Sequence, residues 1–220
     1  MLIAGVDEAG RGCVVGPLVV AGVAFQTEQL QQLSMLGVKD SKLLTAKKRE
    51  SLYPEIIKLA QSYHIIKIMP TEIDKAVLST RILHKLNRLE AQTMAKVIEA
   101  IKPDEAYVDA ADVVEERFGC HISECLSFET KIVSKHKADR TFAVVSAASV
   151  VAKVERDREI IVLKERYGDF GSGYLTDNKT MNFLKRLLNE NGDYPPFIRK
   201  SWKPAQKAKS EHGTVQKTLG

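Results

Sequence analysis

Four carboxylates stand at, or just after, the ends of predicted strands. Asp7 and Glu8 end the apolar run that opens the chain, Asp109 ends a second run, and Asp139 follows a third. A carboxylate at the end of an apolar strand loses hydration, which is costly unless a partner or a cation compensates. A divalent cation is the simplest compensation for four such groups. Oxygen ligands without His or Cys select a hard ion, Mg²⁺ or Mn²⁺.

Each of these carboxylates also has an ordinary structural interpretation. Asp7 could be a turn residue, Asp109 could cap the following helix, and Asp139 could pair with a neighbouring lysine or arginine. Asp112 is interpreted as a surface or capping residue. The metal hypothesis therefore depends on the four carboxylates occurring together.

A glycine-rich turn follows the first two carboxylates. It contains Gly10, Arg11 and Gly12, with Gly16 slightly further along. Glycines at a strand turn are common, so this element alone is weak evidence. Beside a metal site it gains meaning, because backbone without side chains can approach a sugar and bind the 2′-hydroxyl that distinguishes RNA from DNA. Arg11 can also donate to a phosphate.

The composition fits one main globular unit with a small appendage. The chain has 220 residues, of which 44% are hydrophobic and 28% charged, with a formal net charge of +5. After residue 198 a basic cluster faces only Glu211, which favours a polyanionic partner, although a lysine-rich tail can also serve solubility alone. This cluster comprises Arg199, Lys200, Lys203, Lys207, Lys209 and Lys217.

The cysteines and the apolar segments indicate the compartment. Cys13, Cys120 and Cys125 are odd in number and lack ligand-like spacing with His, so neither a disulfide framework nor a zinc site is expected. The first residues do not resemble a signal peptide, and no apolar run approaches the length of a membrane span. We expect a reduced, cytoplasmic setting.

Apolar runs and turn residues predict an α/β fold. Strands are expected at 2–8, 18–25, 63–69, 105–109 and 129–133, and helices at 45–61, 81–101, 113–126, 142–167 and 176–191. An antiparallel opening pair followed by strands alternating with helices indicates a mixed central sheet flanked by helices. The rest is expected to be a basic tail around Trp202. We expect a catalytic domain at 1–175 and a helical, basic, substrate-binding extension at 176–220.

Six motifs occur in an order that resembles a known family. They are GVDEAGRG at 5–12, DSK at 40–42, YVDAADV at 107–113, KHKAD at 135–139, SAASVVAKVERDR at 146–158 and GSGY at 171–174. Over nearly the whole chain they are similar to type 2 ribonucleases H, the archaeal and bacterial ribonuclease HII. The resemblance implies a ribonuclease H-like fold. It also implies an endonuclease that cuts the RNA strand of RNA–DNA hybrids, and cuts 5′ of ribonucleotides embedded in duplex DNA.

The resemblance also implies roles for individual residues. The metal ligands and catalytic residues would be Asp7, Glu8, Asp109 and Asp139. Ribose recognition would fall to Gly10, Arg11 and Gly12, with Tyr174 stacking on a sugar at the RNA-to-DNA junction. Further phosphate contacts are expected from Ser41, Lys42, Lys153 and Arg156, because a duplex is held mainly through its backbone. Lys153 and Arg156 could instead be solvated helix charges, and Tyr174 a plain surface aromatic.

The expected mechanism uses two divalent cations. One activates water and the other stabilises the leaving 3′-oxygen, which leaves 3′-hydroxyl and 5′-phosphate ends. His136 could move a proton or could be an ordinary structural histidine. The last five residues, Gln216 to Gly220, resemble only the first half of a sliding-clamp-binding peptide, so a clamp is a further possible partner. A monomer is expected.

Two other classes of function remain open at this point. A strand, an aspartate, a glycine turn and a second strand also open the actin-like ATP-dependent phosphotransferases, but those proteins need two such lobes. A non-catalytic hybrid-binding module would use only the basic tail and the glycine turn. Four carboxylates beside a polyanion would weaken such binding, which argues against the module.

Overall fold

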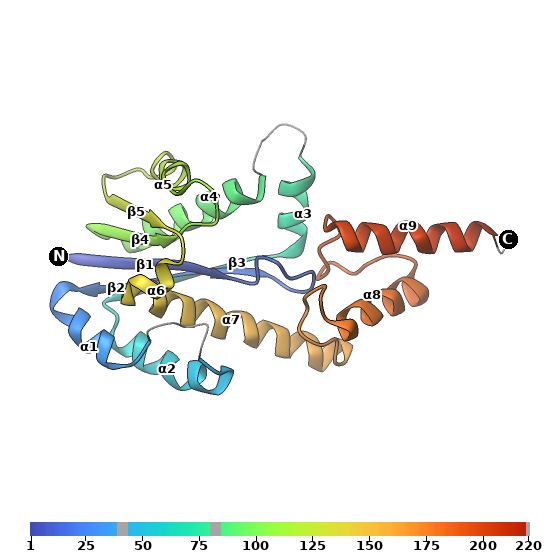
Figure 1. Ribbon diagram of the computed structural model, residues 1–220, viewed down its shortest axis with the longest axis horizontal. Helices are drawn as coiled ribbons and strands as arrows, with labels where there is room; N and C mark the ends of the chain where they lie inside the picture. The colour runs from blue at the N-terminus through green and yellow to red at the C-terminus, as the bar shows by residue number, and fades with distance from the viewer. Residues whose placement is uncertain (39–43, 80–84, 219–220) are drawn as a thin grey trace. The chain divides into compact units, whose positions relative to one another are not determined.

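A five-stranded mixed sheet forms the centre of the fold, with strand order β3-β2-β1-β4-β5 (Figure 1). The computed structural model describes all residues except 39–43, 80–84 and 219–220, and gives no side chains for 213–218. The strands are β1 (Leu2–Ala9), β2 (Leu18–Gln26), β3 (Ser62–Ile68), β4 (Glu105–Asp109) and β5 (Lys131–Lys135). β1 pairs antiparallel with β2 and parallel with β4, and β4 pairs parallel with β5. The predicted mixed sheet is confirmed.

Two glycines let helices approach the opening strands closely. A Cβ atom on Gly5 would lie 2.1 Å from backbone atoms of Val144, and one on Gly22 would lie 2.4 Å from the Val97 side chain. Gly22 pairs with Val6, the residue after Gly5, so the two glycines point to opposite faces of the sheet. One face is therefore covered by α7 and the other by α4.

The helices are α1 (Leu30–Met35), α2 (Ala46–Leu59), α3 (Pro70–Leu78), α4 (Lys85–Ile101), α5 (Glu115–Ser123), α6 (Ala138–Thr141), α7 (Ala143–Tyr167), α8 (Asn178–Asn191) and α9 (Lys203–Thr218). A short 3₁₀ turn, η1 (Thr27–Gln29), precedes α1. Local signals set several ends. The Thr45 side chain accepts a hydrogen bond from the Lys48 amide and starts α2, as predicted. Gly168, with φ 85°, follows the last residue of α7. Within the described residues, no helix is long and apolar enough to cross a membrane.

Some predicted boundaries were wrong. β5 runs from Lys131 to Lys135 rather than over 129–133, because its register with β4 pairs Glu105 with Lys131 and Asp109 with Lys135. The short helices α1, α3 and α6 were not predicted, since apolar periodicity is hard to read in so few residues. A further helix, α9, lies where only a basic tail around Trp202 was expected.

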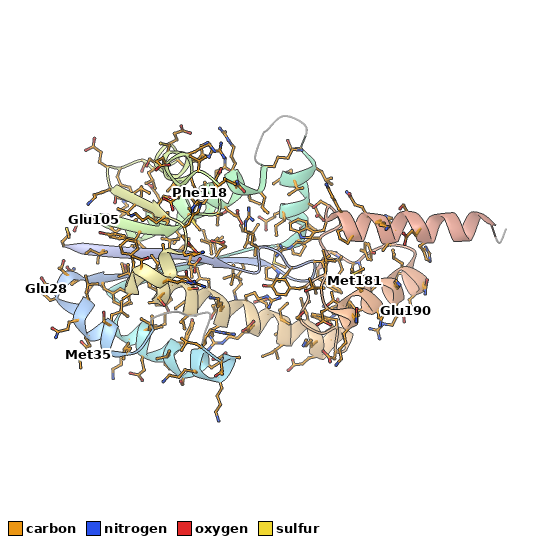
Figure 2. The ribbon with its side chains drawn as sticks, viewed as in Figure 1. Glu28, Met35, Glu105, Phe118, Met181 and Glu190 are labelled. Carbon is orange, nitrogen blue, oxygen red and sulfur yellow. The ribbon has the colours of Figure 1, made fainter. Side chains whose placement is uncertain are left out.

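The chain divides into two compact units. The first contains residues 1–9, 19–67 and 84–155, and its core joins β1, β2, α1, α2 and the first part of α7. In this unit Phe118 of α5 is fully buried, whereas Met35 at the end of α1 is exposed (Figure 2). The second unit contains residues 10–18, 68–83 and 156–220, with a core that includes Phe170, Phe183 and Phe197. The expected functional boundary after residue 175 stays a prediction.

Candidate active site

Three of the four expected metal ligands meet in the first unit. Each of Asp7, Asp109 and Asp139 offers a carboxylate oxygen, and these atoms lie within 4.8 Å of one another. Asp7 and Asp139 are buried and Asp109 is half-buried. β1 and β4 are parallel neighbours, so the ends that carry Asp7 and Asp109 meet at the same edge of the sheet. β5 ends at this edge too, shortly before Asp139.

The turn after β5 places Asp139. Lys137 has a left-handed backbone conformation, with φ 55° and ψ 36°, and it redirects the chain into α6. The amide of Ala138 donates to Oδ1 of Asp109 at 3.0 Å. Asp109 therefore holds the first turn of α6, which also contains Asp139, at the end of its own strand.

The electrostatics of Asp7 match a cation site. Burial and the negative charge of Asp109 raise the pKa of Asp7 to about 7, against the opposing effects of a Ser149 hydrogen bond and the Lys153 charge. The Glu8 amide also donates to Asp7 Oδ1 at 2.7 Å. A divalent cation would remove the repulsion between these carboxylates. The donor set, all oxygen and closely spaced, fits a hard ion.

Glu8 is outside this group of three. It is half-buried, and as the next residue of β1 it follows Asp7 on a strand whose successive side chains point to opposite faces. Its role as a fourth ligand therefore stays a prediction.

Lys153 lies near the carboxylates on α7. Its Nζ donates to Ser149 Oγ at 2.7 Å, and both side chains lower the pKa of Asp7. Lys153 is therefore part of the environment of Asp7, while its contact with phosphate stays a prediction. Two other predicted phosphate-binding residues, Ser41 and Lys42, lie outside the described residues.

Asp112 and His136 form a structural network in the first unit. Asp112 is buried rather than on the surface, and its ion pair with Arg117 holds the pKa of the Asp112 carboxyl well below its usual range. It also accepts a bond from the Val114 amide, as a capping residue would. His136 Nε2 lies 2.7 Å from the Asp112 carbonyl oxygen, and Nδ1 lies 3.1 Å from Glu115 Oε1. Both ring nitrogens of His136 are thus engaged, which supports the structural interpretation.

In the second unit, the glycine turn and Tyr174 lie side by side. Gly10 has φ 87°, and a Cβ atom there would lie 2.8 Å from the Pro17 carbonyl oxygen, so no other residue fits easily. Cys13 forms an isolated β-bridge with Tyr174. A Cβ atom on Gly12 would be 3.7 Å from the Tyr174 ring. The two elements predicted to recognise ribose are therefore neighbours.

Arg156 supports Tyr174 from inside the second unit. Its Nη2 donates to Cys13 Sγ at 2.9 Å and to the Ser172 carbonyl at 3.0 Å, and the guanidinium carbon lies 5.5 Å from the centre of the Tyr174 ring. Burial and the neighbouring Cys13 raise the pKa of Tyr174 to about 12. Arg156 is buried, so its interpretation as a solvated helix charge is wrong. A phosphate contact by Arg156 stays a prediction.

The basic cluster after residue 198 is partly neutralised inside the protein. Arg199 is fully buried, so it is not a surface cation. Lys200 and Lys209 both form ion pairs with Asp193, at 2.9 and 2.7 Å. The expectation that Glu211 is the only acid facing this cluster was wrong, because Asp193 precedes the segment in the sequence yet contacts Lys200 and Lys209 in the fold. No sequence signal distinguished Arg199 from its neighbours.

The sheet order and the three clustered carboxylates, two at strand ends and one in α6, fit a metal-dependent nuclease with a ribonuclease H-like fold. The family model of ribonuclease HII matches residues 4–205. The chain belongs to the ribonuclease HII family, whose members are divalent-metal-dependent enzymes that cleave RNA in RNA–DNA hybrids. This membership decides against both the actin-like phosphotransferase and the non-catalytic binding module.

Individual relatives match over most of their length. Ribonuclease HII of Cenarchaeum symbiosum is 50% identical, and the alignment covers 94% of this chain and 97% of the relative. The crystal structure of ribonuclease H2 from Pyrococcus horikoshii OT3 has a TM-score of 0.90 at 41% identity, covering 97% of this chain and 99% of the other. Ribonuclease HII of Archaeoglobus fulgidus, solved in a complex with PCNA, has a TM-score of 0.83 at 42% identity, covering 92% and 96%.

Proposed function

We propose that Asp7, Glu8, Asp109 and Asp139 hold two divalent cations, Mg²⁺ or Mn²⁺, for hydrolysis of the RNA strand of hybrids and for cutting 5′ of ribonucleotides embedded in duplex DNA. The products would carry 3′-hydroxyl and 5′-phosphate ends. One observation carries the assignment: oxygens of Asp7, Asp109 and Asp139 lie within 4.8 Å of one another at one edge of the sheet.

The protein supplies the geometry for this reaction. Bound cations supply the positive charge that favours deprotonation of water and stabilises the leaving 3′-oxygen. Asp109 orients the turn that carries Asp139 through the Ala138 amide. Ser149 and Lys153 favour the ionised form of Asp7, the form that binds a cation. These contacts support the proposed roles of Asp7, Asp109 and Asp139 as metal ligands.

The glycine turn and Tyr174 would recognise the ribonucleotide. The backbone of Gly10, Arg11 and Gly12 can bind a 2′-hydroxyl because no side chain blocks the two glycines. Tyr174 is 40% exposed, so its ring can stack on the next sugar, where a deoxyribose allows a closer approach than a ribose. Phosphate contacts would come from Arg11 and Lys153, and from Ser41, Lys42 and Arg156.

Cleavage mapping tests the proposal. The substrate is a labelled DNA duplex with one ribonucleotide, compared in Mg²⁺, Mn²⁺ and EDTA. We expect one cut on the 5′ side of the ribonucleotide, and none in EDTA. Asp109→Asn and Asp139→Asn should lower turnover by orders of magnitude, because an amide keeps the shape but loses the charge. Glu105→Gln is the matched control, since Glu105 lies at the opposite end of the same strand. Wild-type turnover in both aspartate variants would rule out this metal centre.

A sliding clamp is a further proposed partner. The relative from Archaeoglobus fulgidus was solved in a complex with PCNA, and this chain ends in a glutamine-led peptide at 216–220. Co-elution of the full chain with an archaeal clamp, and its loss on truncation after residue 214, would support the proposal.

We also propose a cytoplasmic monomer. The three free cysteines support the compartment, and light scattering of purified protein tests the oligomeric state.

A further inference from the structure

The Arg199 side chain is a fully buried charge in the second unit. A buried guanidinium is costly unless hydrogen bonds satisfy it. Its Nη2 donates to the carbonyl oxygens of Gly10 at 2.7 Å and Gly16 at 3.2 Å, and Nη1 donates to that of Arg11 at 2.8 Å. Its Nε adds a bond to Gly16 at 3.3 Å, and the guanidinium carbon lies 5.0 Å from the Trp202 ring centre. The planar fork of arginine thus binds both ends of the glycine turn.

These bonds fix the direction of two successive peptide units. In a trans peptide the C=O and N–H groups point in opposite directions. The carbonyls of Gly10 and Arg11 point toward Arg199, so the amides of Arg11 and Gly12, which belong to the same peptide units, point away from it. Gly12 is exposed. Consecutive amides turned to one side form a donor pair for an oxygen ligand.

Arg199 is itself firmly held. Its amide donates to the Val14 carbonyl at 2.9 Å. The next two residues are bound to Asp74 of α3, which accepts the amides of Lys200 and Ser201, both at 2.9 Å, and the Ser201 hydroxyl at 2.6 Å. The guanidinium is therefore a rigid support for the glycine turn rather than a mobile cation.

We propose that Arg199 is a positioning residue for ribose recognition. By holding the carbonyls of Gly10 and Arg11, it presents the amides of Arg11 and Gly12 to the 2′-hydroxyl of a bound ribonucleotide. The proposal rests on the proposed function of the glycine turn. Without the guanidinium the two peptide units can rotate, and the enzyme loses its preference for ribose while it still binds the phosphate backbone.

The test compares binding of two duplexes with the same sequence. KM is measured for a DNA duplex with one ribonucleotide, and Ki for the all-DNA duplex as competitive inhibitor. For Arg199→Gln we expect KM to rise at least about tenfold while Ki changes less than about twofold. Arg199→Lys keeps the charge but loses the fork, so its KM should be intermediate. The midpoint of a Mg²⁺ titration should stay at the wild-type value in both variants.

Asp74→Asn is the matched control, because it weakens the anchoring of the same segment without removing a bond to the glycine turn. It should lower thermal stability and keep the wild-type ratio of Ki to KM. A wild-type ratio in both Arg199 variants would overturn the proposal. An equal rise of KM and Ki, or the same loss of ratio in Asp74→Asn, would overturn it as well, since either indicates a general structural role. If Arg199→Gln does not fold, the ratio of Ki to KM of Arg199→Lys tests the proposal in its place. Failure of the proposed function is distinct, because the wild type would then not cleave.

Discussion

Replacing Asp7 with asparagine should stabilise the metal-free protein at alkaline pH while abolishing cleavage. Burial and the Asp109 charge raise the pKa of Asp7 from an ordinary 3.8 to about 7. The folded state therefore opposes ionisation of this carboxyl, and the difference between the two pKa values corresponds to at most about 4 kcal/mol. Asparagine keeps the size of the side chain and removes the charge. The free energy of unfolding at pH 8 in EDTA should rise by up to this amount.

The stability difference between Asp7→Asn and the wild type should depend on pH. Between pH 4 and 7 the folded protein binds a proton at Asp7 more tightly than the unfolded chain does. The contribution of Asp7 to stability therefore becomes more unfavourable as pH rises through this window, and levels off above it. The advantage of Asp7→Asn over wild type should be small near pH 4 and largest above pH 7.

Metal binding should reverse the order of stability of the wild type and Asp7→Asn. The cation binds ionised Asp7, so binding below pH 7 releases a proton, and Mg²⁺ should stabilise the wild type more at pH 8 than at pH 6. The asparagine variant should gain little stability from Mg²⁺ at either pH. Its turnover should fall by orders of magnitude.

The assay is urea unfolding followed by circular dichroism at pH 4.5, 6 and 8, in EDTA and in Mg²⁺. Asp112→Asn is the control of opposite sign. Arg117 holds the pKa of Asp112 well below its usual range, so this carboxylate stabilises the fold above about pH 4, and the stabilisation is lost as pH falls. Its replacement should destabilise the protein at pH 8. The reasoning on Asp7 is refuted if Asp7→Asn is no more stable than wild type at pH 8, or if the difference is the same at pH 4.5.

Two other predictions concern the substrate. Tyr174→Ala removes a stacking contact worth roughly 1–3 kcal/mol for bases, with a sugar at the low end, so kcat/KM on the single-ribonucleotide duplex should fall about fivefold or more. A fully ribonucleotide-containing hybrid is the reference substrate, and equal wild-type rates on both would remove Tyr174 from the site. Lys203, Lys207 and Lys209 are exposed on α9, and Lys209 forms an ion pair with Asp193. Replacing Lys203 and Lys207 with Ala should therefore lower the slope of log affinity against log salt by at most about 2. An unchanged slope, measured by fluorescence anisotropy, would mean that this helix does not contact the duplex.

The sequence alone determined much of the local structure. The apolar runs defined β1, β2 and β4, the Thr45 cap defined the start of α2, and Gly168 defined the end of α7. These signals act over a few neighbouring residues, so they can be read along the chain. The apolar runs also placed Asp7 and Asp109 at strand ends, and the order of the motifs identified the family.

Only the tertiary structure decided which charges are buried and what they bind. Asp139 reaches the other carboxylates because Lys137 adopts a left-handed conformation that no apolar pattern predicts. Arg199 looks like part of a basic surface in the sequence, yet it binds the carbonyl of Arg11, 188 residues away. Whether a charge is solvated or buried depends on partners that are distant in the chain, and it is the fold that brings those partners together.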